Sequence, residues 1–310
     1  MRSRLILALV FAALLSADPA LAARSPSLGR TAVVNKVAGT VWVKDRGENR
    51  FTRLPRSRTL VRMGAKIDAT NGRARVRTAA GAGRPLNNGV FSKGVFTISQ
   101  RRRANAITNL KLLGGNFRSC GKGAGTRTVR SLRGRGRGRF KTRGRYSAAT
   151  VRGTQWVVED RCNGTRTAAE RGSVQTDTDG ELAFVLDAGD EVQYFCDFDG
   201  LAPVSQAFCT VVLNRPADGL WGAGIINLGG DATSYDLYLS DPTGAERFGT
   251  FPFTEPDADG FRQSAVVCNA DRGPGPYSVR WVVGGVQLGP PIGFTGTQPP
   301  SELFCISEPE

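Results

Sequence analysis

The sequence contains no histidine among its 310 residues. This absence excludes Ser-His-Asp and Cys-His catalytic arrangements, and every zinc or iron site that uses an imidazole ligand. Paired carboxylates can hydrolyse glycosides without histidine. The acidic residues clustered between positions 177 and 191, however, fall at turns and strand ends of a hairpin pattern. We therefore predict that the protein is not an enzyme and uses no cofactor.

Long apolar runs are absent from the sequence except near its start. Residues 5–15 form an apolar run that follows Arg2 and Arg4, and Ala20-Leu21-Ala22 comes next. The run is too short for a membrane span, which takes ~20 residues, and the whole pattern is typical of a secretory signal peptide. We assign residues 1–22 to this peptide. The remaining chain is expected to have no transmembrane segment and to be secreted or associated with the cell envelope.

Cysteines are few and even in number. Six cysteines in an exported protein indicate disulfides rather than metal ligands, although six allow fifteen pairings. The favoured pairing joins Cys120 to Cys162, Cys196 to Cys209 and Cys268 to Cys305. The alternative joins Cys209 to Cys268 across a sandwich, as in immunoglobulin-type domains.

Acidic residues are scarce in the first two thirds of the chain. Residues 1–209 carry 37 Lys and Arg against 15 Asp and Glu, whereas residues 210–310 carry 5 against 12. A basic region of this size attracts polyanions, and it could also dock against the acidic part of the same chain. A high arginine content is also typical of GC-rich genomes, so charge alone does not choose between these interpretations.

Short alternating runs rich in β-branched residues, separated by glycine-bearing turns, predict an all-β fold. Residues 150–158 are expected to form one strand, followed by a hairpin at Asn163-Gly164 and a second at Asp179-Gly180. Residues 88–100 are expected to form a further hairpin that turns at Lys93-Gly94. In residues 73–78 three arginines alternate with Ala, Val and Thr, which predicts a half-buried strand with one arginine-lined face.

Two ordered patterns resemble the FecR domain family. Residues 39–43 read G-x-V-x-V, and residues 61–76 read v-x-x-G-x-x-I-x-A-x-x-G-x-a-x-V. Residues 151–158 then read V-x-G-T-x-W-x-V, before a G-x-V and an apolar strand. The resemblance covers residues 31–195.

In the FecR family this domain lies outside the cytoplasmic membrane and relays signals, by protein contact, to an anti-sigma region inside the cell. The sequence lacks the transmembrane helix that such a relay needs. The resemblance therefore implies only an extracytoplasmic binding or scaffold role, including envelope-associated sensing.

A basic insertion, residues 121–145, interrupts the resemblance. Ten of its 25 residues are basic and none is acidic. One interpretation is a solvated, self-repelling loop; the other is a site for a polyanion such as a wall phosphate polymer. Nucleic acid is not an expected partner because the chain is exported and only Phe140 and Tyr146 could stack on bases. The candidate polyanion-binding residues are Arg133, Arg135, Arg137, Arg139, Lys141, Arg143 and Arg145.

After a predicted linker at residues 196–207, residues 208–310 contain five clear strands and predict an immunoglobulin-like β-sandwich. Trp221 or Trp281 is its expected core tryptophan. Asp257 and Asp259 form a weak calcium candidate in a D-x-D-G pattern, which is more typical of a β-turn. The partner is expected to be a cell-envelope protein or an anionic envelope polymer. The alternative function is a carbohydrate-binding or carboxylate-based glycan-active module in this sandwich.

Overall fold

The computed structural model describes residues 25–120, 127–178, 181–197, 208–215, 220–227, 232–240, 243–253, 262–268, 277–294 and 305–307. Its regular structure is β-strand apart from one 3-10 turn, η1 (Phe117–Ser119), so the predicted all-β fold is confirmed. Within these ranges no helix is long and apolar enough to cross a membrane. The predicted signal peptide and most of the predicted linker lie outside the described residues.

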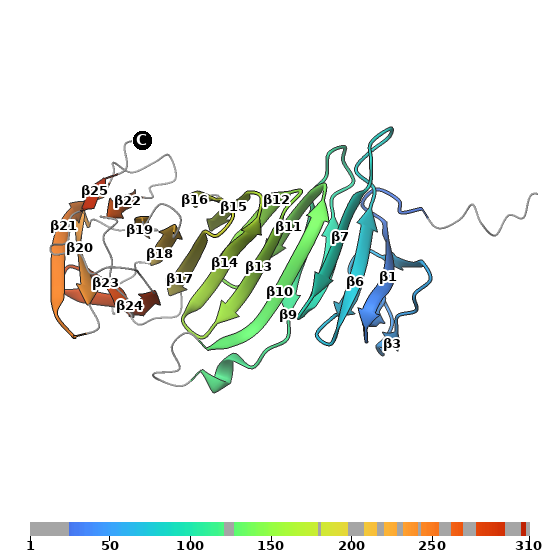
Figure 1. Cartoon of the computed structure of the whole chain (residues 1–310), viewed down its shortest axis with the longest axis horizontal. Helices are drawn as coiled ribbons and strands as arrows, with labels where there is room; N and C mark the ends of the chain where they lie inside the picture. Colours follow the sequence, from blue (N-terminus) through green and yellow to red (C-terminus); the bar gives the residue numbers. More distant parts are fainter. Residues whose placement is uncertain are drawn as a thin grey trace, which may run out of the picture.

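Two large sheets face each other along the long axis of the molecule and enclose one apolar core (Figure 1). Sheet A runs in the order β4 (Thr59–Arg62), β1 (Thr31–Gly39), β6 (Gly72–Thr78), β7 (Asn87–Ser92), β10 (Thr128–Arg137), β13 (Gln155–Arg161), β14 (Gly164–Arg171), β17 (Glu191–Asp197), β18 (Phe208–Arg215), β19 (Leu220–Asn227), β22 (Arg262–Cys268) and β25 (Cys305–Ser307).

Sheet B covers the inner face of sheet A. It runs in the order β3 (Thr52–Arg53), β2 (Trp42–Lys44), β5 (Lys66–Asp68), β8 (Val95–Gln100), β9 (Thr108–Leu113), β11 (Arg139–Arg143), β12 (Ala148–Arg152), β15 (Val174–Thr178) and β16 (Glu181–Leu186). Paired strands in both sheets are antiparallel except β9 and β11, which run parallel. Apart from the two short strands β3 and β4 at the edges, strand numbers rise steadily along each sheet.

The chain reaches this order by crossing repeatedly from one sheet to the other. The hairpin predicted at Lys93-Gly94 is wrong, because β7 belongs to sheet A and β8 to sheet B. Lys93 has a φ of 68°, and the link folds the chain over the core so that Phe91 and Phe96 meet inside, with ring centroids 5.5 Å apart. Both strands bury alternate residues. This pattern requires each strand to face the core, but it does not require the two strands to be hydrogen-bonded to each other.

The single strand predicted over residues 150–158 is also wrong. Gly153, at a φ of 88°, ends β12 in sheet B and sends the chain into β13 in sheet A. Only glycine adopts this conformation without strain. The predicted hairpin is confirmed as β13 and β14, but its two-residue turn is Cys162-Asn163 and not Asn163-Gly164, because Arg161 lies opposite Gly164. The second predicted hairpin is confirmed as β15 and β16, although Asp179 and Gly180 at its turn lie outside the described residues.

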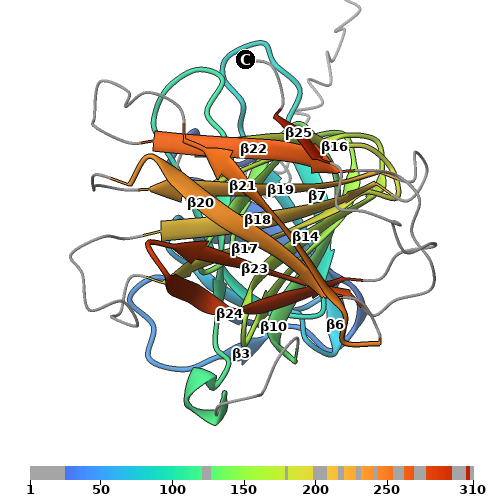
Figure 2. The same ribbon diagram turned by 90° about the vertical axis from the view of Figure 1, so that its left-hand side faces the viewer.

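A third sheet packs on the outer face of sheet A at the C-terminal end. Sheet C runs in the order β21 (Glu246–Pro252), β20 (Ser234–Ser240), β23 (Tyr277–Val283) and β24 (Val286–Phe294). Phe195, Val212 and Ile225 of sheet A share one apolar cluster with it, and Trp281 lies fully buried there, as predicted. Figure 2 shows sheet C in front of β17, β18 and β19.

Sheet A continues without interruption into this C-terminal sandwich. Strand β17 pairs with β14 on one side and with β18 on the other. The two strands that flank the predicted linker are therefore hydrogen-bonded neighbours. The C-terminal sandwich uses the same sheet as the region that resembles FecR domains.

The backbone register bears on the cysteine pairing. Cys196 lies opposite Cys209 in β17 and β18, and Cys268 lies opposite Cys305 in β22 and β25. Opposite residues in antiparallel strands have Cα atoms about 4.5–5.5 Å apart, within the range that a disulfide spans. Cys209 and Cys268 stand two strands apart and face Ile226 and Trp221 of β19, five residues apart along that strand. Their Cα atoms are therefore roughly 19 Å apart, which is too far for a disulfide.

We therefore predict two cross-strand disulfides, Cys196–Cys209 and Cys268–Cys305. Mass spectrometry of peptides from the unreduced protein should recover both linked pairs. A linked peptide that contains Cys209 and Cys268 would contradict the register.

Candidate anion-binding site

The Arg/Gly repeat is not the solvated loop that its composition suggested. Residues 128–137 form β10, which lies between β7 and β13 inside sheet A, and residues 139–143 form β11 in sheet B. Only residues 121–126 of the predicted insertion lie outside the described residues. The physical reason is the period of the repeat: Arg-Gly alternation matches the period of two in a strand, so all glycines fall on one face and all arginines on the other.

The glycines of the repeat make room for aromatic rings in the core. A Cβ atom on Gly134 would lie 2.5 Å from the ring of Trp156, and one on Gly136 would lie 3.2 Å from the ring of Phe140. Trp156 is fully buried and donates its indole N–H across the core to the hydroxyl of Thr142 at 3.0 Å. The close approach of the β10 backbone to these rings therefore requires residues without side chains.

Arg133, Arg135 and Arg137 of β10 point to the outer face of sheet A, where they meet arginines from neighbouring strands. The strand with an arginine-lined face predicted at residues 73–78 is confirmed as β6. In the register, Arg75 is opposite Val90 of β7, and Val90 is opposite Arg135 of β10. Gln155 of β13 follows, and Arg171 of β14 ends this row. The alternation of side chains along each strand and the pairing of the strands thus bring together arginines that are distant in sequence.

These side chains line an open groove of about 460 Å³ on the outer face of sheet A. Its cations are Arg75, Arg135, Arg137 and Arg171, and no acidic side chain is among the described residues that line it. None of the ion pairs within the described part of the chain involves these four arginines. The groove therefore gathers four arginines that have no ion-pair partner among the described residues; the carboxylate at its edge, Glu170, pairs with Arg133.

Polar donors complete the groove. Asn88, Thr154 and Gln155 line it beside the arginines, although the side-chain amide of Gln155 already donates to Glu170. Thr154 is only 6% exposed, yet its hydroxyl has no hydrogen-bond partner, and the buried Nε of Arg75 has none either. A buried polar group without a partner costs about 1–3 kcal/mol. Both residues are among those that line the groove.

Like charges crowd at one side of the groove. The pKa of Arg77 is lowered, first by its partial burial and then by the charges of Arg75 and Arg58. Arg77 donates to the side chain of Asn35 at 3.2 Å, and no carboxylate offsets it among the described contacts. An anion bound here would relieve this repulsion.

Farther along the same face, the arginines are neutralised. Arg133 pairs with Glu170 at 2.7 Å, and Arg166 pairs with both Glu159 and Glu191. The first pair joins the strands that carry Arg135 and Arg171, and the second group lies on β13, β14 and β17, toward the strands that sheet C covers. They mark where the uncompensated positive face ends.

The seven residues predicted to bind polyanions are divided between several places. Arg135 and Arg137 line the groove, and Arg133 stands at its paired edge. Lys141 in β11 lies in sheet B, away from the groove, and pairs with Asp177 of the same sheet at 3.0 Å. Arg145 stacks on Phe117 and Tyr146, at 5.1 and 4.8 Å from their ring centroids.

Two predicted residues remain. Arg143, at the end of β11, lies in sheet B and not in the groove. Arg139, at the start of that strand, lines a second depression that is described below. Composition missed Arg75 and Arg171 because they lie far from the repeat in sequence. The alternation of arginine in residues 73–77 did indicate that Arg75 lies on an arginine-lined face.

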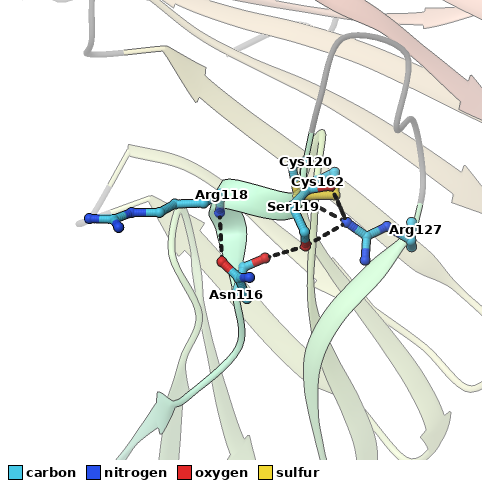
Figure 3. Close-up of a disulfide and its surroundings, with 6 residues drawn as sticks. All are labelled: Asn116, Arg118, Ser119, Cys120, Arg127 and Cys162. Carbon is cyan, nitrogen blue, oxygen red and sulfur yellow. Dashed lines mark hydrogen bonds between the residues drawn. A yellow bond between two sulfur atoms is a disulfide. The ribbon is translucent and has the colours of Figure 1, made fainter.

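The predicted disulfide between Cys120 and Cys162 is confirmed, with Cα atoms 5.3 Å apart. It ties the end of η1 to the end of β13. Figure 3 shows Arg127 beside it, donating from Nη2 to the carbonyl and hydroxyl oxygens of Ser119 at 2.7 and 2.9 Å. The disulfide thus fixes the chain just before β10 begins, at the opposite end of that strand from Arg137.

The calcium candidates Asp257 and Asp259 lie outside the described residues. Within the part that the structure describes, no group of three or more Cys, Asp or Glu side chains is arranged to hold a metal ion. Comparison of the chain with protein-family models, with curated proteins and with solved structures gives no match.

Proposed function

We propose that this chain is a non-enzymatic, extracytoplasmic binding protein that holds a phosphate-rich anionic polymer on the outer face of sheet A. The observation that carries the proposal is the groove in which Arg75, Arg135, Arg137 and Arg171 converge from three strands without a carboxylate partner. The guanidinium group binds phosphate through two parallel hydrogen bonds. Arginines that approach from three strands suit a tetrahedral anion, whose oxygens point in several directions.

The lining of the groove favours binding over turnover. Its described side chains are hydrogen-bond donors and apolar groups, with no carboxylate or thiol to act as base or nucleophile. It also lacks an aromatic side chain on which a nucleobase could stack. A polymer recognised through its charged backbone is therefore favoured over a nucleic acid.

Three features support a location outside the cytoplasm. The N-terminal sequence has the signal-peptide pattern, the chain forms the Cys120–Cys162 disulfide, and the order of its motifs resembles FecR domains. Disulfides persist mainly in oxidising compartments. On this proposal the polymer belongs to the cell envelope, and the protein acts there as a scaffold or as the binding part of a sensor.

The proposal is tested by binding of the full mature chain to long-chain inorganic polyphosphate, polyglutamate and neutral dextran over a range of salt concentrations. We expect polyphosphate to bind, with log affinity falling linearly against log salt because bound counterions are released. Stronger binding of polyglutamate would assign the groove to carboxylate polymers instead. Equal binding of dextran, or binding that is independent of salt, would overturn the proposal.

A further inference from the structure

A second depression, of about 380 Å³, lies next to the groove. Arg84, Arg139 and Arg152 line it together with Asn105 and Gly138. None of these arginines forms an ion pair within the described part of the chain. The second depression is therefore a separate concentration of positive charge and hydrogen-bond donors.

The chain connects the two depressions at two points. Arg137 lines the groove, Gly138 follows it, and Gly138 and Arg139 line the second depression. Likewise Arg152 lines the second depression, and the next residues, Gly153 and Thr154, line the groove. Both connections are the corners where the backbone passes between sheet A and sheet B.

Both corners are glycines, and neither places a side chain between the two depressions. Gly153 has a φ of 88°, and a Cβ placed on it would meet no protein atom within 4 Å, so the residue faces open space. Gly138 has a φ of 98°, and a Cβ there would lie 2.3 Å from the side-chain oxygen of Asn87. Glycine at 138 thus permits the close approach to Asn87, and glycine at 153 leaves open space between the depressions.

One cation of the second depression, Arg139, is held in place by hydrogen bonds. Arg139 donates from Nη1 to the carbonyl of Asn105 at 2.8 Å, and its backbone N–H donates to the side chain of Asn87 at 2.9 Å. Asn87 is buried and donates in turn to Thr78 and Thr108 at 3.2 and 3.3 Å. Cations positioned in this way lose little freedom when they bind an anion.

We propose that the two depressions are subsites for one linear phosphate polymer, which passes over the end of the sandwich at Gly138 and Gly153. This inference rests on the proposed function. From Arg135 to Arg139 the backbone spans at most about 14 Å, since each of four residues extends at most about 3.6 Å. A chain of several linked phosphates covers that distance, whereas orthophosphate fills only one subsite.

The consequence is a dependence of affinity on chain length. Once one phosphate segment is bound in the groove, the next segment meets the second subsite at a high effective concentration. Linked subsites of this kind can raise the overall affinity by a factor of roughly 10²–10⁴ without any new contact. A single groove would give no such gain.

The test measures binding of orthophosphate, tripolyphosphate and long-chain polyphosphate to the full mature chain and to two variants, by isothermal titration at constant ionic strength. For the wild type we expect affinity to rise with chain length. Replacing both Arg84 and Arg152 by glutamine should weaken long-chain binding at least about tenfold, towards the value for tripolyphosphate. The matched control, K66Q/K111Q, removes the same charge from exposed positions in sheet B and should leave the length dependence intact.

The possible failures are distinguishable. If the wild type binds no phosphate compound, both the proposed function and this inference are wrong. The inference is wrong if the wild type binds all three compounds with the same affinity, or if R84Q/R152Q and K66Q/K111Q weaken long-chain binding equally. In either case the groove binds phosphate without help from the second depression. Circular dichroism and the unfolding midpoint of each variant verify that the fold is retained.

Discussion

Replacing Arg75, Arg135 and Arg171 together by glutamine is expected to lower the affinity for long-chain polyphosphate about a thousandfold at low salt. These residues come from β6, β10 and the end of β14, and they meet in one groove. A hydrogen bond to a charged group contributes about 1.5–3 kcal/mol, so losing three removes about 4 kcal/mol or more. The slope of log affinity against log salt should also become shallower by about 2–3, since three phosphate contacts are lost.

The control for this experiment removes three charges elsewhere. Arg53, Lys66 and Lys111 are exposed residues of sheet B, outside both depressions. The variant R53Q/K66Q/K111Q has the same net charge as the groove variant. If both variants lost affinity equally, the polymer would be responding to overall charge, and the groove would have no special role.

Replacing Gly134 by valine is expected to lower the free energy of unfolding by about 3 kcal/mol. The new Cβ would lie 2.5 Å from the ring of Trp156, which is fully buried and hydrogen-bonded across the core. Overfilling a packed core typically costs about 1–3 kcal/mol, and here neither the ring nor the β10 backbone has room to move. Urea unfolding, followed by circular dichroism, measures the effect.

The neighbouring position supplies the matched control. Arg135 is exposed on the other face of the same strand, so R135V introduces the same β-branched side chain without a clash. We expect its midpoint to stay close to the wild-type value, because surface substitutions usually change stability by less than about 0.5 kcal/mol. Equal midpoints for G134V and R135V would mean that the glycines do not face the core.

The sequence predicted those features that depend on local alternation. The arginine-lined strand at residues 73–78 and the hairpin about Asn163 follow from strand period and turn residues, and both are confirmed. The Cys120–Cys162 pair was also predicted correctly. The first two features are set by the chemistry of a few residues near one another, whereas the pairing was chosen among fifteen because both cysteines fall within residues 31–195.

The errors have a common cause. A hairpin and a corner between sheets both join two alternating strands through a short glycine-bearing link, as at Lys93-Gly94 and at Gly153. The choice depends on which distant strand is available for pairing, and alternation within one segment does not contain that information. The Arg/Gly repeat was misinterpreted because its composition suggested disorder, although its period fits a strand beside Trp156.

The groove was only half predictable for the same reason. Arg135 and Arg137 were singled out, and the arginine face that includes Arg75 was recognised, but nothing in the sequence joined them. They become neighbours because β7 lies between β6 and β10 in sheet A. Pairing register, which is non-local, determines which of the 42 basic residues form the site.

The steady rise of strand numbers along sheets A and B has a consequence for how the molecule assembles. Nearly every strand pairs with a strand made shortly before it, so the sandwich can grow from its N-terminal end by adding one layer at a time. Stability in such a stack is largely a sum over neighbouring layers, as in repeat proteins. Because a chain is synthesised from its N-terminus, this one can fold vectorially while it emerges. The arginine groove is complete once β14 has been laid down, before sheet C exists.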